Sequence, residues 1–271
     1  MATPTIAFIG AGKMATALAR GFVSAGMVET SSIRASDPGE AALDAFCESA
    51  PGCVRAETNA DAVDGADVVI LAVKPQHLPG VLAGLATAPA ARPLFVSIAA
   101  GFSLASLESG LPTGARVVRV MPNTPSLVGR GVSAFSPGQH ATGDDSTLVG
   151  RLLEAVGAAH EVPESQLDAV TGLSGSGPAF VYTIIEAMTD AGIRAGLPAA
   201  VAADLAARTV AGAAHMVLET GDHPALLRRA VTSPGGTTAA GLAALDRHGL
   251  RHALGEAVAA AVVQSKELGK G

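Results

Sequence analysis

The stretch from Thr5 to Ala25 constrains the fold of this chain more than any other part. A short apolar run is followed directly by the letters G-A-G-K-M-A at positions 10 to 15 and then by a helical pattern. A strand, a glycine turn and a helix in this order form the context that the dinucleotide fingerprint G-x-G-x-x-G/A requires. In this interpretation Gly10 allows the tight turn, Gly12 lets backbone N–H groups approach a pyrophosphate, and Ala15 permits close helix packing. The pyrophosphate would lie at the positive end of the helix dipole.

A lone fingerprint can also be a plain turn between a strand and a helix, so its meaning depends on the elements further along the chain. Apolar strand-like runs alternate with helical runs, such as those at 11–25 and 40–49, throughout the first half of the chain. Strands are expected at 5–9, 33–36, 53–56, 67–73, 94–98 and 117–121. Continuous apolar strands between helices are typical of a parallel sheet that is covered on both faces. The prediction is an α/β fold with an N-terminal Rossmann-like domain and a mostly parallel sheet.

The second half of the chain has a different pattern. From about Asp168 onward the sequence predicts alanine-rich helices, which include a start at Pro178, a long helix from 197 to about 221, and helices at 237–247 and 250–266. Aromatic residues are only 3% of the chain, which leaves little bulk for a helical core within one copy. We therefore expect an all-α C-terminal dimerisation domain that buries its apolar faces against a second subunit. The predicted domains are residues 1–162 and 163–271, as the length of 271 residues favours two domains.

Composition bears on location and on partners. Hydrophobic residues make up 49% of the chain, but no segment reaches the roughly 18 uninterrupted apolar residues of a spanning helix. The N-terminus has no basic region before a separate apolar one, so neither a signal peptide nor membrane insertion is expected, and the predicted location is cytoplasmic. Cys47 and Cys53 are interpreted as reduced thiols in the core.

The charges and histidines argue against two further classes of function. The net charge is −6, and the Lys and Arg residues form no basic stripe, so nucleic acid is not an expected partner. The seven histidines show no metal-ligand spacing, and no metal site is predicted.

The fingerprint also expects an acidic residue about 20 positions further on, at the end of the second strand, which would bind the ribose 2′-OH. Asp37 stands there, whereas Ser36 and Arg34 could instead bind a 2′-phosphate. From these residues alone the choice between NADH and NADPH stays open.

Residues 231–242, V-T-S-P-G-G-T-T-A-A-G-L, form a second glycine turn before a helix. Its position in the helical half favours an anion other than the cofactor phosphate, although Ser233-Pro234 could be a helix stop and Thr237 or Thr238 an ordinary N-cap. Lys74-Pro75 ends a buried strand at the sheet edge where ligands bind in α/β folds, which favours a ligand contact, and a solvated strand end is the alternative. The residues 174–177 could be a flexible linker, but the proline and the long helix that follow favour a fixed turn beneath the nicotinamide pocket.

Together these motifs resemble the pyrroline-5-carboxylate reductase family. The matching segments are F-I-G-A-G-K-M-A at 8–15, L-A-V-K-P-Q at 71–76, S-I-A-A-G at 97–101, M-P-N-T-P at 121–125, D-A-V-T-G-L-S-G-S-G-P-A-F at 168–180 and T-S-P-G-G-T-T at 232–238. The resemblance implies an NAD(P)H-dependent reduction of 1-pyrroline-5-carboxylate to L-proline, the last step of proline biosynthesis, with NADP(H) favoured and NAD(H) as the second candidate. It also implies an interlocked homodimer and often a larger ring of dimers. Asp37 departs from the Ser or Arg that family members often present to the 2′-phosphate.

The resemblance and the fingerprint assign residues to two sites. Those along the cofactor are Ile9, Gly10, Ala11, Gly12, Lys13, Met14, Ser36, Asp37, Asn59, Ala72, Val73, Lys74, Pro75, Ala99 and Ala100. Those beside the substrate are Glu164, Ser233, Gly235, Gly236, Thr237 and Thr238, and Thr238 is the candidate catalytic residue, as its hydroxyl could hydrogen-bond to the ring nitrogen.

Three other functions stay open at this stage. One is a hydroxyacid dehydrogenase of similar two-domain plan, another is a reductase of a different cyclic imine, and the third is a non-catalytic sensor that binds NADP(H). The four lysines are Lys13, Lys74, Lys266 and Lys270, and none falls in the interior helices of the second half, where a dehydrogenase needs a group for the alcohol proton. An imine that binds as an iminium ion needs no strong general acid, so this absence favours imine chemistry.

Overall fold

The computed structural model describes residues 3–86 and 93–269, and the chain forms two compact units. The first unit comprises residues 1–176 and 260–271, and the second comprises residues 177–259. Lys270 lies outside the described residues. The division after residue 162 concerns the roles of the two segments and stays a prediction.

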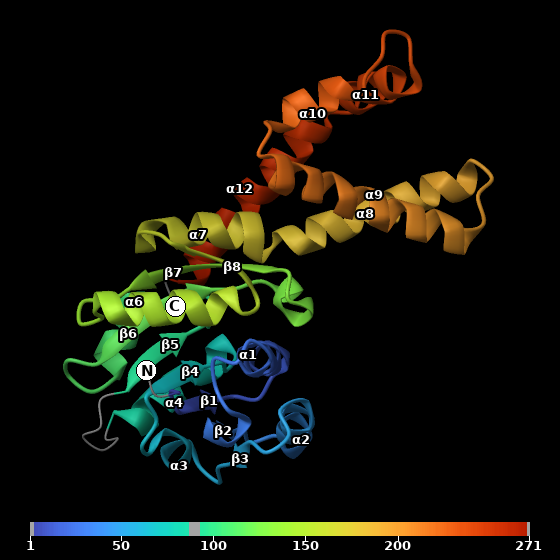
Figure 1. Cartoon of the computed structure of the whole chain (residues 1–271). Coiled ribbons are helices and arrows are strands. Elements are labelled where there is room, and N and C mark those ends of the chain that lie inside the picture. The colour runs from blue at the N-terminus through green and yellow to red at the C-terminus, as the bar shows by residue number, and fades with distance from the viewer. Residues whose placement is uncertain (1–2, 87–92, 270–271) are drawn as a thin grey trace. The chain divides into compact units, whose positions relative to one another are not determined.

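The first unit is built on an eight-stranded sheet of order β3-β2-β1-β4-β5-β6-β7-β8 (Figure 1). All neighbouring strands are parallel except β6 and β7, which are antiparallel. The strands are β1 (Ile6–Ile9), β2 (Ile33–Ser36), β3 (Val54–Arg55), β4 (Val68–Leu71), β5 (Leu94–Ser97), β6 (Arg116–Met121), β7 (Gly131–Pro137) and β8 (Gly157–Glu161). The predicted mostly parallel sheet is confirmed.

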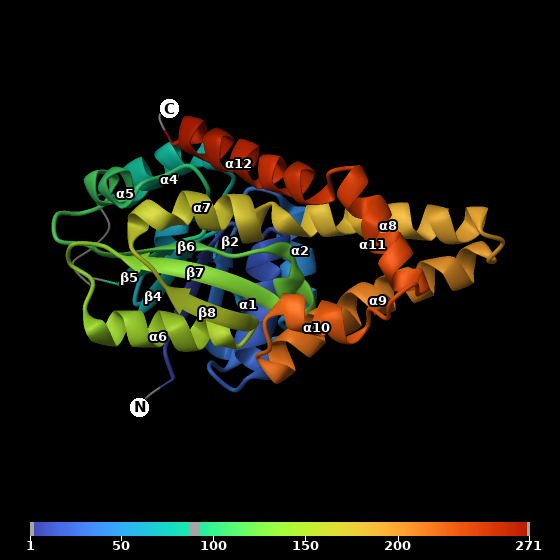
Figure 2. The same ribbon diagram turned by 90° about the horizontal axis from the view of Figure 1, so that it is seen from above.

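Helices cover both faces of this sheet, because side chains alternate along each strand. Ile6 and Phe8 of β1 contact the cluster formed with α1, α2 and α6, whereas Ala7 and Ile9 contact the cluster formed with α3, α4 and α5. Figure 2 shows α6 alongside β8. The helices of this layer are α1 (Lys13–Ser24), α2 (Glu40–Ser49), α3 (Asn59–Val63), α4 (Leu78–Leu85), α5 (Leu104–Gly110) and α6 (Gly143–Glu154).

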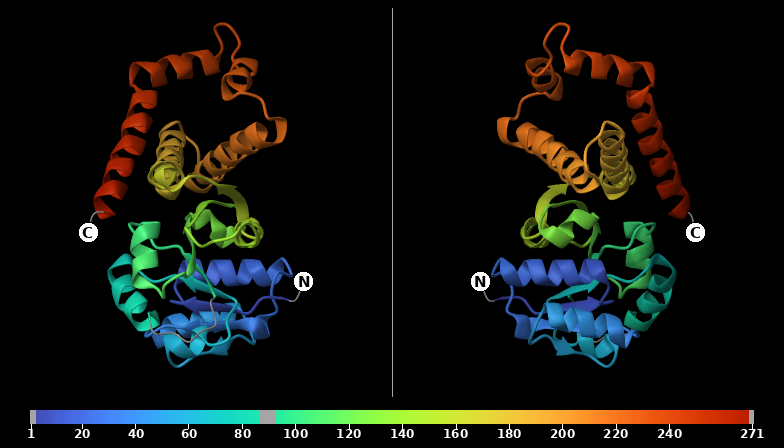
Figure 3. Two further views of the ribbon diagram at one scale, coloured as in Figure 1. Left: turned by 90° about the vertical axis from the view of Figure 1, so that its left-hand side faces the viewer. Right: turned by 90° about the vertical axis from the view of Figure 1, so that its right-hand side faces the viewer.

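Two segments after the sheet complete the first unit. Helix α7 (Leu167–Val170) continues into a π-helical turn, Thr171–Gly175, in which the N–H of Ser176 donates to the Thr171 carbonyl at 2.8 Å. The last part of α12 (Leu250–Leu268) also belongs here, since Ser265 donates to Asp168 at 2.7 Å. Figure 3 shows the end of this helix beside the sheet unit.

The π-helical turn corrects one prediction. Residues 174–177 do not form a turn that interrupts the chain, since the helical path continues from α7 through Gly175 into α8. The hydroxyls of Thr171 and Ser174 donate to carbonyls four residues earlier, which keeps these polar residues compatible with a helix.

The second unit is entirely helical. It contains α8 (Gly177–Arg194), α9 (Ala199–Thr220), α10 (Pro224–Ala230), α11 (Thr237–Arg247) and the first part of α12. Helices α8 and α9 pack side by side, as Figures 1 and 2 show. Within residues 177–259 only Ala202 and Ala206 are buried.

Helix α9 is the one helix of the described residues that is long and apolar enough to cross a membrane by length and composition. A core helix of a soluble protein passes the same test, so α9 is weak evidence for insertion.

Candidate functional site: a dinucleotide pocket and a second helix start

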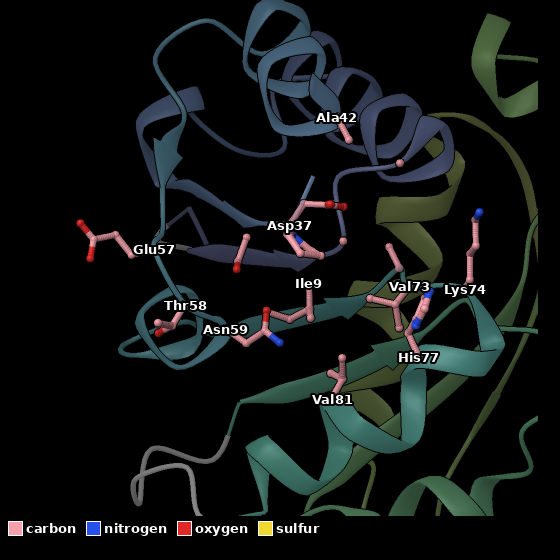
Figure 4. A pocket seen from close by; sticks show the side chains of 15 residues that line it. Ile9, Asp37, Ala42, Glu57, Thr58, Asn59, Val73, Lys74, His77 and Val81 are labelled. Atoms are coloured by element: carbon pink, nitrogen blue, oxygen red, sulfur yellow. The ribbon is translucent and has the colours of Figure 1, made fainter. Parts of the chain in front are cut away.

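A cavity of about 630 Å³ lies where β1, β2 and β4 end at the carboxyl edge of the sheet (Figure 4). Open α/β sheets bind ligands at this edge. Its walls are formed by Ile9, Gly10, Gly12, Ser36, Asp37, Pro38, Ala42, Glu57, Thr58, Asn59, Ala72, Val73, Lys74, His77 and Val81. A cavity of this size falls in the ordinary range of ligand sites.

The structure brings nine of the fifteen predicted cofactor residues into this wall, namely Ile9, Gly10, Gly12, Ser36, Asp37, Asn59, Ala72, Val73 and Lys74. The other six, Ala11, Lys13, Met14, Pro75, Ala99 and Ala100, do not line the cavity. Ala11 and Ala99 are buried, and Lys13 and Pro75 are exposed. The cofactor role of all fifteen stays a prediction.

The geometry of the glycine loop shows why glycine is needed at position 10. Gly10 has φ +97°, and a Cβ at this position would lie 2.7 Å from the Ala72 carbonyl oxygen at the end of β4. Both the backbone conformation and the close approach require glycine. Gly12 is different, since a Cβ there would have no atom within 4 Å and would extend into open space. The loop is therefore pressed against the sheet at Gly10 and open at Gly12.

The start of α1 is free to bind an anion. Gly12 is its N-cap, no side chain caps the helix, and no acidic residue occupies its first turn. The first N–H groups of a helix have no intrahelical partner and carry partial positive charge. The cradle at Gly10 and this uncapped helix start fit the pyrophosphate of a dinucleotide.

Asp37 is held in the cavity wall by two backbone donors. Its Oδ2 accepts from the N–H of Ala11 at 2.7 Å, and its Oδ1 accepts from the N–H of Gly39 at 2.8 Å. The carboxylate therefore links the end of β2 to the glycine loop. Arg34 lies elsewhere, because its guanidinium donates to the backbone carbonyl of Asp64, before β4.

Six residues of the wall were not predicted from the sequence: Pro38, Ala42, Glu57, Thr58, His77 and Val81. Thr58 and Asp61 form a reciprocal capping box at the start of α3, and the T-x-x-D pattern is a recognisable helix start. That signal could have placed residues 57–59 beside the end of β3. Figure 4 shows Lys74 and His77 on the opposite side of the cavity from Glu57.

Glu164 is engaged by two groups of the first unit. Its Oε1 accepts from the backbone N–H of Leu104 at 2.6 Å and from Arg119 at 3.0 Å. Through these two bonds Glu164 links the first turn of α5 to β6. The role of Glu164 beside the substrate stays a prediction.

The second glycine turn precedes α11. Gly235 has φ +71°, and a Cβ on Gly236 would lie 2.4 Å from the Oγ of Ser233, so the turn is compact. Gly236 is the N-cap of α11, with no side-chain cap and no acidic residue in the first turn. The alternative in which Thr237 or Thr238 caps the helix is therefore wrong. Both threonines lie in the first helical turn, and Thr238 is half-buried.

The two cysteines lie at the two ends of the segment that joins α2 to β3, with Cys47 in the last turn of α2 and Cys53 directly before β3. Their Sγ atoms are 2.8 Å apart, and both thiols are free and half-buried. Burial, followed by the hydrogen bond to Cys47, raises the pKa of Cys53 to about 12. A thiol with this pKa is a poor nucleophile at neutral pH.

Within residues 3–86 and 93–269, no three His, Cys, Asp or Glu side chains are grouped so as to hold a metal ion.

Two family models match different parts of the chain. Residues 164–268 match the family model for pyrroline-5-carboxylate reductase dimerisation, and residues 5–101 match the model for NADP oxidoreductase, coenzyme F420-dependent. A pyrroline-5-carboxylate reductase from Methanosarcina acetivorans is 47% identical over 270 residues, which cover 100% of both chains.

Two solved structures share the whole fold. A pyrroline-5-carboxylate reductase from Coxiella burnetii has a TM-score of 0.91 at 36% identity, with 100% of each chain covered. A pyrroline carboxylate reductase from Plasmodium falciparum, solved with NADP bound, has a TM-score of 0.89 at 30% identity, with 99% of each chain covered. Because these likenesses extend over the full length, the chain belongs to the pyrroline-5-carboxylate reductase family.

Proposed function

We propose that this protein reduces 1-pyrroline-5-carboxylate to L-proline with NAD(P)H as the electron donor. The observation that carries the proposal is the full-length identity of 47% to a pyrroline-5-carboxylate reductase, combined with a cavity that fits a dinucleotide. The NADP oxidoreductase match and the NADP in the Plasmodium structure favour NADP(H), with NAD(H) as the second candidate.

In the first unit, we assign the chain's own groups to the cofactor. The free N–H groups at the start of α1 hold the pyrophosphate, and Asp37 faces the adenosine ribose. When bound, the nicotinamide supplies the hydride that forms the new C–H bond at the imine carbon. The protein's contribution is to orient the donor and the acceptor, which can remove much of the entropic cost of the reaction.

In the second unit, we assign the turn at 233–238 to the substrate. Ser233 and the N–H groups from Gly235 to Thr238 bind the ring carboxylate, because the start of α11 is uncapped and its first turn carries no negative charge. The Thr238 hydroxyl hydrogen-bonds to the ring nitrogen, which receives the electron pair of the C=N bond. With an iminium substrate this nitrogen already carries its proton, so no separate acid is needed. Glu164 remains a proposed member of the substrate site.

We also propose that the protein is a homodimer that assembles into a larger ring, and that it is cytoplasmic. The dimerisation match of residues 164–268 and the exposed apolar side chains of α8 and α9 support the dimer. The two free thiols agree with a reducing compartment.

The absorbance of NADPH or NADH, followed with three substrates, tests the activity. We expect oxidation with pyrroline-5-carboxylate and far less with a piperideine carboxylate or a β-hydroxyacid. No oxidation of either nucleotide with pyrroline-5-carboxylate would contradict the proposal. Turnover of the β-hydroxyacid alone would instead identify a dehydrogenase, and nucleotide binding without any turnover would identify a sensor.

A further inference from the structure

We propose that Cys47 and Cys53 form a reversible disulfide in the presence of a small-molecule disulfide such as oxidised glutathione, and that this bond ties α2 to β3 beside the cavity. We call these two residues the thiol pair. The proposal concerns oxidation of the chain itself and does not depend on the proposed reaction.

A tight turn brings the two thiols together. The N–H of Cys53 donates to the carbonyl of Ala50 at 3.1 Å, directly after the end of α2. Gly52 has φ +97°, so the segment A-P-G-C at 50–53 has the residues and the positive φ of a type II turn, with proline second and glycine third. This turn folds Cys53 back onto the last turn of α2, where Cys47 lies six residues earlier.

The two sulfurs are close enough to bond after a small movement. The Cys53 thiol donates to the Cys47 sulfur at 2.8 Å, whereas a disulfide bond is about 2.05 Å long. Both thiols are free and half-buried, so neither is sealed from a small reagent. The pair is therefore held in contact before any oxidant arrives.

The two thiols differ in reactivity, and Cys47 is the one that attacks. Cys47 is the acceptor in the hydrogen bond between them. The hydrogen bond to Asp44 raises the pKa of Arg55, and charge on the Cys47 sulfur raises it further, so this guanidinium lies close to the pair. A guanidinium beside a sulfur favours the thiolate, which is the form that attacks a disulfide. Cys53 keeps its proton longer, because burial and the contact with Cys47 raise its pKa to about 12.

The exchange proceeds in two balanced steps. The Cys47 thiolate attacks one sulfur of oxidised glutathione, the glutathione S–S bond breaks, and one glutathione leaves as a thiolate that takes a proton from solvent. The mixed disulfide carries no charge on Cys47, so burial is the cause that still raises the pKa of Cys53. Cys53 then gives its proton to solvent, attacks the Cys47 sulfur and releases the second glutathione. Two protein thiols are oxidised, and one glutathione disulfide is reduced to two thiols.

The new bond connects two elements that carry one side of the cavity wall. Helix α2 carries Ala42, and the segment after β3 carries Glu57 and Thr58. Figure 1 shows α2 beside β3, and Arg55 of β3 already pairs with Asp44 of α2. Neither cysteine lines the cavity, so the bond tightens this layer without entering the ligand space. A cross-link also restrains the unfolded chain, which raises the stability of the oxidised protein.

Measurements on the wild-type protein test the proposal without any substitution. The protein is incubated with oxidised glutathione, and mass spectrometry should show the loss of two hydrogen atoms per chain and a peptide that joins residues 47 and 53. The melting temperature should be about 5 °C higher than that of protein reduced with dithiothreitol. Hydrogen exchange at residues 54–60 should be slower in the oxidised form, whereas exchange in α6, which lies elsewhere on the sheet, should not change.

Two variants separate the roles of the thiols. Cys53→Ser should stop the exchange at the mixed disulfide, with the added mass of one glutathione on residue 47. Cys47→Ser should react about tenfold more slowly than Cys53→Ser, because burial still raises the pKa of Cys53. Equal rates for the two variants would contradict the assignment of Cys47 as the attacking thiol. The proposal is overturned if the wild-type protein accumulates only mixed disulfides or disulfides between chains, or if the oxidised and reduced forms show the same melting temperature and the same exchange at 54–60.

Discussion

The two units of this molecule bury their apolar residues in different ways. The sheet unit encloses two clusters, one on each face, which include Phe8, Phe22 and Phe46. In residues 177–259 only two alanines are buried, and large apolar side chains such as Leu205 are about half exposed. The first unit therefore carries its own core, whereas the second requires a partner surface.

The same contrast extends to the two glycine turns. Both precede an uncapped helix with no acidic residue in the first turn, so both can bind an anion. The first is fixed against a buried strand through Gly10 and Ala72, and the second is held only by local contacts such as that of Gly236 with Ser233. This contrast suggests a rigid site for the hydride donor at the first turn. It also suggests that the site for the hydride acceptor, at the second turn, is completed when subunits assemble.

The largest expected effect is at the exposed helices. Leu205→Glu should abolish the dimer, because an unpaired charge in an interface costs about 3–5 kcal/mol, or more than 100-fold in dissociation constant. Light scattering after size-exclusion chromatography measures the mass. Val54→Glu is the matched control, since Val54 is 46% exposed in the first unit and Leu205 is 50% exposed in the second. A dimer that survives Leu205→Glu, or is lost equally in the control, would contradict the account of the second unit.

The next effect separates the two glycines of the first loop. Gly10→Ala should destabilise the protein by about 2–4 kcal/mol, because an L side chain is strained at φ +97° and would collide with Ala72. Gly12→Ala should lower the melting temperature far less, through the poorer N-cap alone, and weaken nucleotide binding, since its Cβ enters open space in front of α1. Thermal unfolding and calorimetry on both variants provide the comparison. Equal melting temperatures for the two variants would show that the loop is not pressed against the sheet.

Apolar strands could be predicted from the sequence, but the strands at the far edge of the sheet could not. Strands β1 to β6 all fall on runs that were expected, although β2 and β6 include arginines among their apolar residues. Strand β7 contains Gly131, Ser133, Ser136 and Pro137, which are typical of a loop, although its serines are buried. Strand β8 ends in exposed polar residues at the sheet edge. Strand β7 pairs with β6, and β8 pairs with β7, so these two strands depend on the neighbouring sheet and not on local propensity.

A smaller effect is expected at the second turn. Thr238→Ala should preserve the fold, because Gly236 and not Thr238 caps α11, and should lower kcat/KM for the imine by about 1.5–3 kcal/mol, or roughly 10- to 150-fold. Steady-state kinetics with saturating nucleotide provide the measurement. Thr147→Ala in α6 is the control, since that hydroxyl donates only to its own helix, at the Gly143 carbonyl. An unchanged kcat/KM would remove Thr238 from the mechanism.

The smallest effect concerns the thiols of the first unit. The raised pKa of Cys53, about 12 against 9.0 for a free thiol, keeps it protonated in the folded state while the unfolded chain ionises. Folded-state stability should therefore fall as pH rises from about 9 towards 12, and be unaffected below this range. Cys53→Ala should remove part of this pH dependence. Alkylation by iodoacetamide at pH 9 in a Cys47→Ala background, which leaves burial as the cause of the raised pKa of Cys53, should be slower in the folded than in the unfolded chain, and equal rates would refute the effect of burial.

The site could be predicted only where a motif carries it. The fingerprint, the residues after β4 and the family resemblance together gave nine residues of the cavity wall, whereas Glu57 and His77 were missed. The position of the Arg34 side chain away from the cavity could not be predicted, because its partner is the backbone carbonyl of Asp64, 30 residues further along the chain. The π-helical turn was missed because Gly and Ser are typical of turns, and only their hydrogen bonds show a helix.

Deuterium transfer tests the central claim most directly. The wild-type protein is incubated with pyrroline-5-carboxylate and with NAD(P)H that carries deuterium at C4 of the nicotinamide, in each of the two stereochemical forms in turn. Mass spectrometry then measures the deuterium in the product. Direct hydride transfer predicts L-proline that carries one deuterium at the former imine carbon from one of the two forms. Proline without deuterium from both forms, or no proline at all, would contradict the account.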